Sequence, residues 1–274
     1  MRITRISVWQ LDLPLVEPYW LSGGRLKFEK LDSTFVKVDT DSGLSGWGEA
    51  CPWGHTYLPA HGAGVRAALE LLAPALIGAD PLALESLNRR MDIALPGHPY
   101  AKAPLDMACW DILGTHAQLP LWQLFGGEVA DPVPVNSSIS TGTPEEMIAL
   151  IHRASSGGYR THSAKIGGTD IAADIARIEA ISHALPIGEK VTFDVNRAWT
   201  PGVAVQVLNT VAARDWIEQP CETIAQCAHV AARVSNPIML DECMHNFGDH
   251  LEAWRTQACE GAKVKPNRVG GLTR

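Results

Sequence analysis

The chain lacks the features that mark secreted, membrane-spanning or zinc-binding proteins. Its cysteines form no CxxC pair, which argues against a zinc site or a disulfide framework and favours reduced thiols that pack in the interior. The six cysteines are Cys51, Cys109, Cys221, Cys227, Cys243 and Cys259. No apolar stretch reaches transmembrane length, and the first residues alternate apolar and polar side chains instead of forming the apolar segment of a signal peptide. The sequence therefore predicts a cytoplasmic protein with no membrane partner.

Positive charge and nucleotide-binding motifs are also scarce. The 274 residues carry a formal net charge of -7, which is unsuited to binding a phosphate backbone, so nucleic acid is not an expected partner. The glycine pairs that follow residues 166 and 269 occur without a GxGxxG motif or a P-loop lysine and therefore predict turns. With 46% hydrophobic residues, the chain can build the large core of an ordinary soluble enzyme.

Residues 1–130 predict an α+β capping domain. Strand-like segments near 2–13, 32–40 and 43–50 are followed by helical patterns with apolar residues three and four positions apart. Residues 131–274 instead alternate short apolar runs with helical stretches, which predicts a (β/α) barrel domain. Its six expected strands lie near 133–140, 160–166, 190–196, 215–219, 237–241 and 262–266.

Five charged residues recur along the second domain at nearly constant spacing. They are Lys165, Asp194, Glu218, Asp241 and Lys265, separated by 29, 24, 23 and 24 residues. Each lies in or just after a short apolar run, and a period in the mid-twenties fits one strand plus one helix. Because the carboxyl ends of parallel barrel strands meet at one rim, we expect these side chains to line a common pocket.

This pattern suits the removal and return of a proton beside a metal ion. A single acidic residue at a strand end is usually a helix cap or a surface charge, but three in register would repel one another unless a cation neutralised them. Mg²⁺ is the natural candidate because it prefers oxygen ligands. The lysines of the second and sixth strands would face a bound substrate from opposite sides.

The predicted barrel is incomplete. A full eight-stranded barrel takes about 250 residues, whereas only about 145 follow residue 130, which is enough for six strands. We therefore expect a truncated barrel without strands 7 and 8, whose missing segment would supply one wall of the substrate pocket.

Six sequence stretches occur in an order and spacing that are specific together, although each is weak alone. They are APLDMACWDILG from Ala103, PLWQLFGG from Pro120, FDVNRAW around Asp194, IEQP around Glu218, LDE at Asp241, and KPNRVGGLT at Lys265. With these stretches the whole chain resembles the enolase superfamily, and within it the mandelate racemase/muconate lactonizing subgroup.

The resemblance implies abstraction of the proton α to a carboxylate, giving an enediolate held by Mg²⁺. Asp194, Glu218 and Asp241 would bind the ion, and Lys165 and Lys265 would be the catalytic acid/base pair. Two further residues are implied as supporting groups near the metal. They are Asn196, two positions beyond Asp194 on an extended strand, and Glu242, whose side chain should point away from that of Asp241.

One position departs from the pattern of the family. Many relatives carry Lys-x-Lys on the second strand, whereas this chain has Ser163-Ala164-Lys165. The loss of that positive charge favours a substrate that is itself cationic, with Ser163 as a substrate contact. The alternative is a higher pKa for Lys165.

Aromatic residues support a cationic substrate. Tyr19, Trp20, Trp53 and Tyr57 lie in the expected loops after the first and third strands, which in the family close over the barrel mouth. Aromatic faces attract ammonium groups, although packing between the domains is the alternative explanation. The stretch RRMDIALPGHPYAKAPLDMACWD also resembles proline-betaine and hydroxyproline-betaine epimerases and cis-3-hydroxyproline dehydratases.

Several functions remain open at this point. The first is a Mg²⁺-dependent epimerase, racemase or dehydratase acting on a proline-type amino acid or betaine, and the second is a dipeptide epimerase or muconate-type cycloisomerase. The third is a non-catalytic fragment that binds metal or ligand without turnover. A small-molecule carboxylate is the expected partner, and a symmetric homo-oligomer is expected because relatives often form one.

Overall fold

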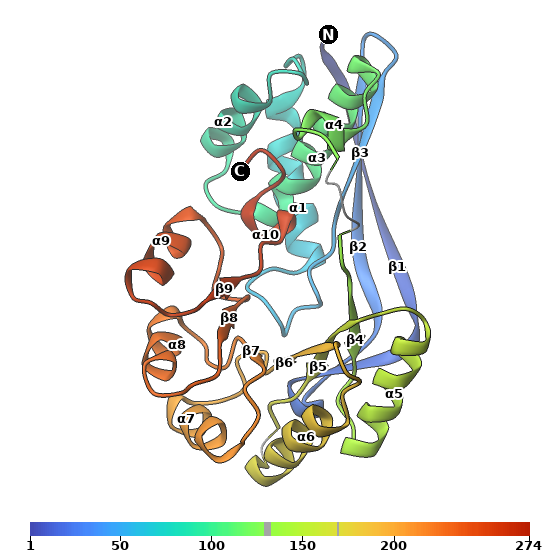
Figure 1. Cartoon of the computed structure of the whole chain (residues 1–274). Coiled ribbons are helices and arrows are strands. Elements are labelled where there is room, and N and C mark those ends of the chain that lie inside the picture. The colour runs from blue at the N-terminus through green and yellow to red at the C-terminus, as the bar shows by residue number, and fades with distance from the viewer. Residues whose placement is uncertain (129–132, 169) are drawn as a thin grey trace. The chain divides into compact units, whose positions relative to one another are not determined.

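The computed structural model describes residues 1–128, 133–168 and 170–274 (Figure 1). The chain divides into two compact units, and neither is a single continuous segment. The first unit comprises Met1–Glu17, Phe28–Asp131 and Lys265–Arg274, and the second comprises Pro18–Lys27 and Pro132–Val264. The boundary predicted near residue 130 lies outside the described residues.

The first unit contains a sheet of three strands in the order β1-β2-β3. They are β1 (Ile3–Leu21), β2 (Leu26–Thr40) and β3 (Ser45–Ala50). β2 and β3 pair antiparallel from Thr34↔Ala50 to Asp39↔Ser45. β1 runs well past the end predicted at residue 13, through two prolines. An edge strand tolerates proline because its outer N–H groups have no neighbouring strand to bond.

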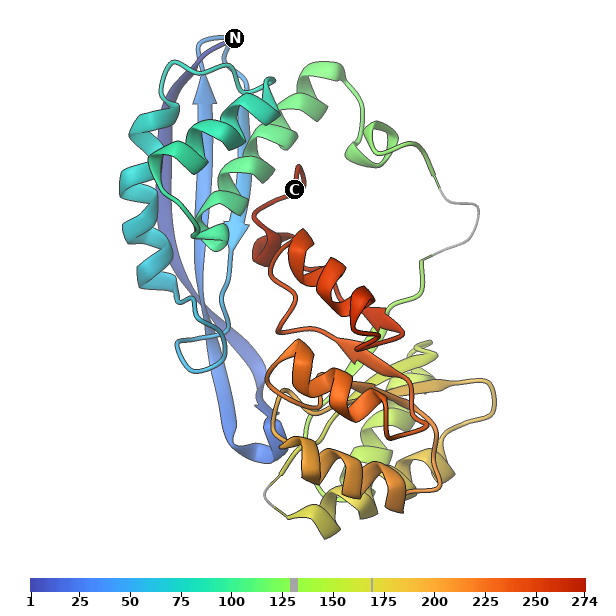
Figure 2. The same cartoon turned by 90° about the vertical axis from the view of Figure 1, so that its left-hand side faces the viewer.

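Helices pack against one side of this sheet (Figure 2). They are α1 (Gly62–Leu76), α2 (Leu84–Ala94) and α3 (Pro99–Ala117), and the short α4 (Leu121–Leu124) follows α3 and contacts it. α3 lies directly on β3. Gly46 and Gly48 allow this close contact, since a Cβ atom at either position would collide with the backbone carbonyl of Ala108 or Pro104. The core of the unit includes Val36, Leu69, Leu72, Leu105 and Ile112.

The last ten residues belong to this first unit and are held by α3. They contain the short helix α10 (Pro266–Val269). The buried carboxylate of Asp106 accepts hydrogen bonds from the backbone N–H groups of Leu272 (2.6 Å) and Thr273 (3.1 Å) and from the Thr273 hydroxyl (2.5 Å). Gly271 has φ of +133°, and a side chain there would collide with Asp106. Only glycine suits this position.

The second unit is a parallel sheet of six strands in chain order, β4 to β9, with helices between successive strands (Figure 1). The strands are β4 (Asn136–Ile139), β5 (Thr161–Lys165), β6 (Lys190–Asp194), β7 (Trp216–Glu218), β8 (Ile238–Leu240) and β9 (Gly261–Ala262). The helices are α5 (Pro144–Ser156), α6 (Ile171–Ala184), α7 (Pro201–Thr210), α8 (Ile224–Ala231) and α9 (Phe247–Arg255). This confirms the predicted α+β domain followed by six strands of a (β/α) barrel.

Local sequence explains where these helices begin. Each has a polar N-cap side chain that accepts a hydrogen bond from a backbone N–H in the first turn, which satisfies a donor that the helix itself leaves unpaired. The N-cap residues are Thr143, Asp170, Thr200, Thr223 and Asn246. The apolar faces of the helices pack on the sheet around Phe193, Ile217 and Leu240. No helix in the described ranges is both long and apolar enough to cross a bilayer.

The sixth strand is shorter than predicted. The sequence places it near 262–266, but β9 covers only Gly261–Ala262, and Lys265 is the N-cap of α10. Pro266 explains the difference, because its ring suits the first turn of a helix and it has no N–H for a sheet ladder. Lys265 is therefore not a strand residue.

Candidate active site

Three of the five predicted residues stand in one row across the sheet of the second unit. Lys165 of β5 is in register with Asp194 of β6, and Asp194 is in register with Glu218 of β7. Each is the last residue of its strand. Side chains in one row of parallel strands point to the same face, which places an ammonium group beside two carboxylates.

Asp241 joins the same face one step further along. Glu218 is in register with Met239 of β8, and Asp241 lies two residues beyond Met239, so both point the same way. The backbone N–H of Asp241 donates to Oε1 of Gln219 (2.7 Å), and Nε2 of Gln219 donates to the carbonyl of Cys221 (2.9 Å). This fully buried amide fixes the start of the loop that carries Asp241.

The three carboxylates are almost completely buried. Asp194, Glu218 and Asp241 are each 1% exposed. Burial and the neighbouring charge of Asp194 raise the pKa of Glu218 well above the usual carboxyl value, although Lys263 and Lys165 act against the shift. Three acids in so dry a position need positive charge nearby.

Lys165 supplies part of that charge by pairing with Asp194. Burial alone would lower the pKa of Lys165, but the negative charge of Asp194, reinforced by Glu218, raises it above its ordinary value. With Asp194 as its partner, Lys165 is held in the protonated form.

Lys263 supplies a second positive charge, and the sequence did not single it out. Its ammonium group pairs with Glu218. Lys263 lies two residues before Lys265, and alternate residues of an extended segment share a face. The pattern Lys263-Val264-Lys265 offers both lysines as candidates but does not say which one reaches the acids.

The residues suit a hard divalent cation by chemistry, although Asp194 and Glu218 are paired with lysines. Within the described ranges, no group of three or more His, Cys, Asp or Glu side chains is gathered tightly enough to hold a metal as it stands. The donors are nevertheless buried carboxylate oxygens at consecutive strand ends, the ligand type that Mg²⁺ prefers. Asp194, Glu218 and Asp241 would hold the ion once the ammonium groups moved aside.

Asn196 and Glu242 contact each other beside these acids. Nδ2 of Asn196 donates to Oε1 of Glu242 (2.9 Å), and the backbone N–H of Asn196 donates to Oδ1 of Asp194 (2.9 Å). The extended backbone expected at Asn196 is wrong, because Asn196 and Arg197 have φ of +46° and +63°. The chain turns directly after β6, and Asn196 contacts Asp194 through its backbone.

Ser163, Tyr19 and Trp20 also belong to the second unit. Ser163 is buried on β5, two residues before Lys165 and therefore on the same face. Tyr19 and Trp20 lie within β1, not in a loop as expected, because β1 continues to Leu21. The Tyr19 hydroxyl bonds Ser138, and the Trp20 ring has the ammonium group of Lys27 over it at 5.3 Å from its centroid.

Trp53, Tyr57 and Lys265 belong to the first unit. Trp53 and Tyr57 lie between β3 and α1, where Trp53 meets Phe28 edge to face with 5.3 Å between ring centroids, and Tyr57 is buried. Lys265 directly precedes α10. The roles assigned to these residues from sequence stay predictions.

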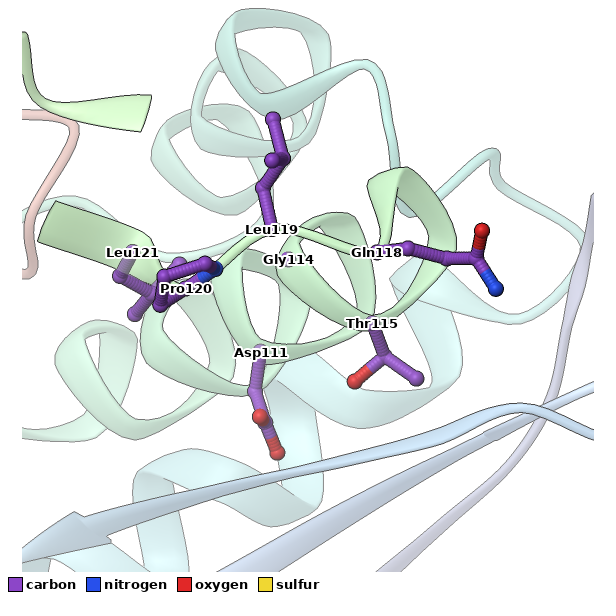
Figure 3. A pocket seen from close by; sticks show the side chains of 7 residues that line it. All are labelled: Asp111, Gly114, Thr115, Gln118, Leu119, Pro120 and Leu121. Atoms are coloured by element: carbon purple, nitrogen blue, oxygen red, sulfur yellow. The ribbon is translucent and has the colours of Figure 1, made fainter. Parts of the chain in front are cut away.

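A separate hollow in the first unit is less suited to chemistry. It measures about 370 Å³ at the end of α3 (Figure 3). It is lined by Asp111, Gly114, Thr115, Gln118, Leu119, Pro120 and Leu121. Asp111 is the only ionisable side chain among these seven, and its carboxylate already accepts the backbone N–H of Trp47 (2.9 Å). The buried row of the second unit is the stronger candidate.

Two family models match most of the chain. Residues 10–126 match the family "Mandelate racemase / muconate lactonizing enzyme, N-terminal domain", and residues 146–274 match "Enolase C-terminal domain-like".

Two curated relatives illustrate the chemistry found among similar proteins. Cis-3-hydroxy-L-proline dehydratase of Roseibium aggregatum is 42% identical, and the match covers 100% of this chain and 75% of that protein. The hydrophobic dipeptide epimerase of Enterococcus faecalis is 32% identical, over 99% of this chain and 77% of that protein.

A solved structure is also similar. An enolase superfamily member from Roseovarius nubinhibens, complexed with magnesium, is 69% identical, with a TM-score of 0.94, and the match covers 100% of this chain and 74% of that one.

The parallel βα unit with buried acids at its strand ends defines an enzyme domain of the (β/α) barrel type. The chain belongs to the mandelate racemase/muconate lactonizing enzyme family of the enolase superfamily. Enzymes of this family are isomerases and lyases, and this protein is one of them.

Proposed function

We propose that the protein abstracts the proton α to the carboxylate of a small substrate with the help of Mg²⁺. The observation that carries the proposal is the registered row Lys165–Asp194–Glu218 together with Asp241 on the same face. When bound by these acids, Mg²⁺ would stabilise negative charge that develops on the substrate carboxylate. A carbon acid beside a carboxylate is too weak for a side-chain base alone.

Lys165 is the proposed base in this scheme. Its ammonium group is paired with Asp194, and it would serve as a base when that carboxylate is engaged with Mg²⁺ instead. The neutral amine then takes the proton from the α-carbon as that C–H bond breaks. Ser163, on the same face of β5, is the proposed substrate contact next to it.

Lys265 is the proposed acid/base group on the opposite side of the substrate. In epimerisation it gives a proton to the α-carbon on that side, which inverts the centre. With a hydroxyl on the β-carbon, the electron pair instead forms the Cα–Cβ double bond as the C–O bond breaks, and the hydroxyl takes a proton from the Lys265 ammonium group and leaves as water. The two reactions share their first step and differ only in the fate of the electron pair.

A proline-type amino acid or betaine is the proposed substrate. The dehydratase relative at 42% identity supports a substrate with a proline-type ring, because its name specifies cis-3-hydroxy-L-proline. A cationic nitrogen is supported by Trp20, whose face already attracts the Lys27 ammonium group. Trp53 and Tyr57 are proposed as further aromatic contacts. The epimerase relative at 32% identity makes a dipeptide the second candidate substrate.

Hydrogen exchange in D₂O tests the proposal. Purified protein with Mg²⁺ is mixed with proline, 3-hydroxyproline, their betaines and a hydrophobic dipeptide, and the α-proton signal is followed by NMR. We expect washout with one of these substrates, loss of washout in Lys165→Ala, and loss on adding EDTA. The matched control is Lys190→Ala, which removes an exposed lysine at the opposite end of β6.

Two results would contradict the proposal. Washout that survives Lys165→Ala would remove that lysine from the mechanism. The absence of washout with every substrate, in protein shown to be folded and to bind Mg²⁺, would favour a binding protein that performs no turnover.

A further inference from the structure

We propose that Lys263 is an internal counter-ion of the metal site, which pairs with Glu218 when Mg²⁺ is absent and must be displaced before Mg²⁺ binds. This inference rests on the proposed function, because it takes Glu218 as a metal ligand. It assigns Lys263 a role in tuning metal affinity that is distinct from proton transfer.

The position of Lys263 follows from the register of the last strand. Gly261 pairs with Met239 and Ala262 with Leu240, and the backbone N–H of Lys263 donates to the carbonyl of Leu240 (2.8 Å). The ladder thus continues through Lys263, which shares the face of Gly261. Met239 is in turn in register with Glu218. The strand register therefore directs the Lys263 side chain to the face that carries Glu218.

The buried carboxylate of Glu218 needs a positively charged partner, and Lys263 provides it. Glu218 lies between Asp194 and the strand that leads to Asp241, and it is 1% exposed. Lys165, a second cation on this face, is engaged with Asp194. A buried carboxylate without a cation is costly, so the ammonium group of Lys263 stabilises the metal-free protein.

The Lys263 side chain can leave Glu218 because it is partly exposed to solvent. It is 28% exposed, whereas Glu218 is 1% exposed. A lysine ammonium on a flexible four-carbon stem is readily rehydrated, so it can turn to solvent when a divalent ion takes over the carboxylate. In this exchange the carboxylates stay in place and only the lysine side chain moves.

Displacement has a measurable consequence for affinity. When only the fraction of molecules with Glu218 released can bind Mg²⁺, the apparent Kd is the intrinsic Kd divided by that fraction. Removal of the ammonium group abolishes the competition and also the repulsion between Lys263 and the bound ion. Both effects act in the same direction and tighten Mg²⁺ binding.

The test is calorimetric titration of Mg²⁺ into metal-free protein without substrate. Relative to wild type, we expect Lys263→Met to lower the Kd by about 10-fold or more, which corresponds to the loss of one competing charge contact. Lys190→Met is the matched control because it removes an exposed lysine from the other end of the same sheet, and its Kd should stay within about 2-fold of wild type.

A second measurement covers the stability of the metal-free state. In EDTA, Lys263→Met should unfold at a lower temperature than wild type, and saturating Mg²⁺ should remove most of that difference. If Lys263→Met is folded only with Mg²⁺, that result supports the proposal. Lys263→Gln, which can still donate a hydrogen bond to Glu218, then serves for the titration and should also bind Mg²⁺ more tightly.

The outcomes separate this inference from the proposed function. An unchanged or weaker Mg²⁺ affinity in both variants, with wild type binding the ion, overturns the role of Lys263 and leaves the proposed reaction standing. Failure of folded wild-type protein to bind Mg²⁺ at all overturns both.

Discussion

Gln219 holds Asp241 through its side chain, because Oε1 of Gln219 accepts the backbone N–H of Asp241 at 2.7 Å. Gln219 has φ of +39° and is fully buried, directly after Glu218. One residue thus connects the ends of β7 and β8, where two of the proposed metal ligands lie.

We expect Gln219→Leu to weaken Mg²⁺ binding about 10- to 100-fold, as is typical when a group that orients a ligand is lost. The loss leaves the N–H of Asp241 and the carbonyl of Cys221 without the partner that Gln219 provides. Calorimetric titration measures the effect, with the exposed Gln206→Leu on α7 as control. Equal affinity in the two variants would show that Asp241 is positioned by other contacts or is not a ligand.

Trp199 and Asp174 form a buried hydrogen bond behind the sheet. Nε1 of Trp199 donates to Oδ2 of Asp174 (3.0 Å), and Arg177 donates to Oδ1 (3.0 Å). Trp199→Phe removes a donor from a fully buried carboxylate, so we expect a loss of about 1.5–3 kcal/mol in the free energy of unfolding. Urea denaturation measures it. Trp254→Phe, at a side chain that is 80% exposed, should change stability by less than about 0.5 kcal/mol.

Thr273 is held between Asp106 and Trp110. Its hydroxyl donates to Asp106 and accepts the Nε1 proton of Trp110 (2.9 Å). Thr273→Val keeps the shape but removes both bonds, and we expect about 1–3 kcal/mol of destabilisation because the Trp110 donor loses its acceptor. The exposed Thr210→Val on α7 is the control in the same urea titration. A difference below the error of the titration would mean that the chain end contributes little to the first unit.

Asp32 and Arg66 form a two-pronged ion pair in the first unit, with N–O distances of 2.8 and 3.0 Å. The hydrogen bond from Arg66 holds the pKa of Asp32 below its ordinary value of 3.8. A lowered pKa means that the pair contributes stability at neutral pH and loses it as the pH falls below 3.8 through the folded-state value.

We therefore expect Asp32→Asn to cost about 0.5–1 kcal/mol at pH 7, since both side chains are partly exposed to solvent. The difference from wild type should shrink progressively as the pH is lowered below 3.8. Urea titrations at several pH values measure it. A cost that is independent of pH would show that the ionised form of Asp32 is not what stabilises the unit.

The sequence predicts most of what is periodic in this protein. The spacing of Lys165, Asp194, Glu218 and Asp241 places them correctly at strand ends, because strand and helix lengths are fixed by hydrophobic pattern. The six-stranded parallel unit follows from the same repeat.

What the sequence misses depends on single backbone turns and on contacts distant in sequence. The left-handed backbone at Asn196 cannot be read from a strand period, and neither can the short β9 that moves Lys265 to a helix start. Lys263 was missed because Lys263 and Lys265, two residues apart, fit the spacing of the strand ends about equally well. Only the actual register shows Lys263 reaching Glu218.

The fastening of the last residues onto α3 has a consequence for biosynthesis. Asp106 emerges from the ribosome more than 160 residues before Leu272 and Thr273, its hydrogen-bond donors. During translation of all the intervening βα repeats, this carboxylate stays without those partners. The amino-terminal unit thus reaches its final packing only after the second unit has been made, so the usual order of domain maturation is reversed for part of its core.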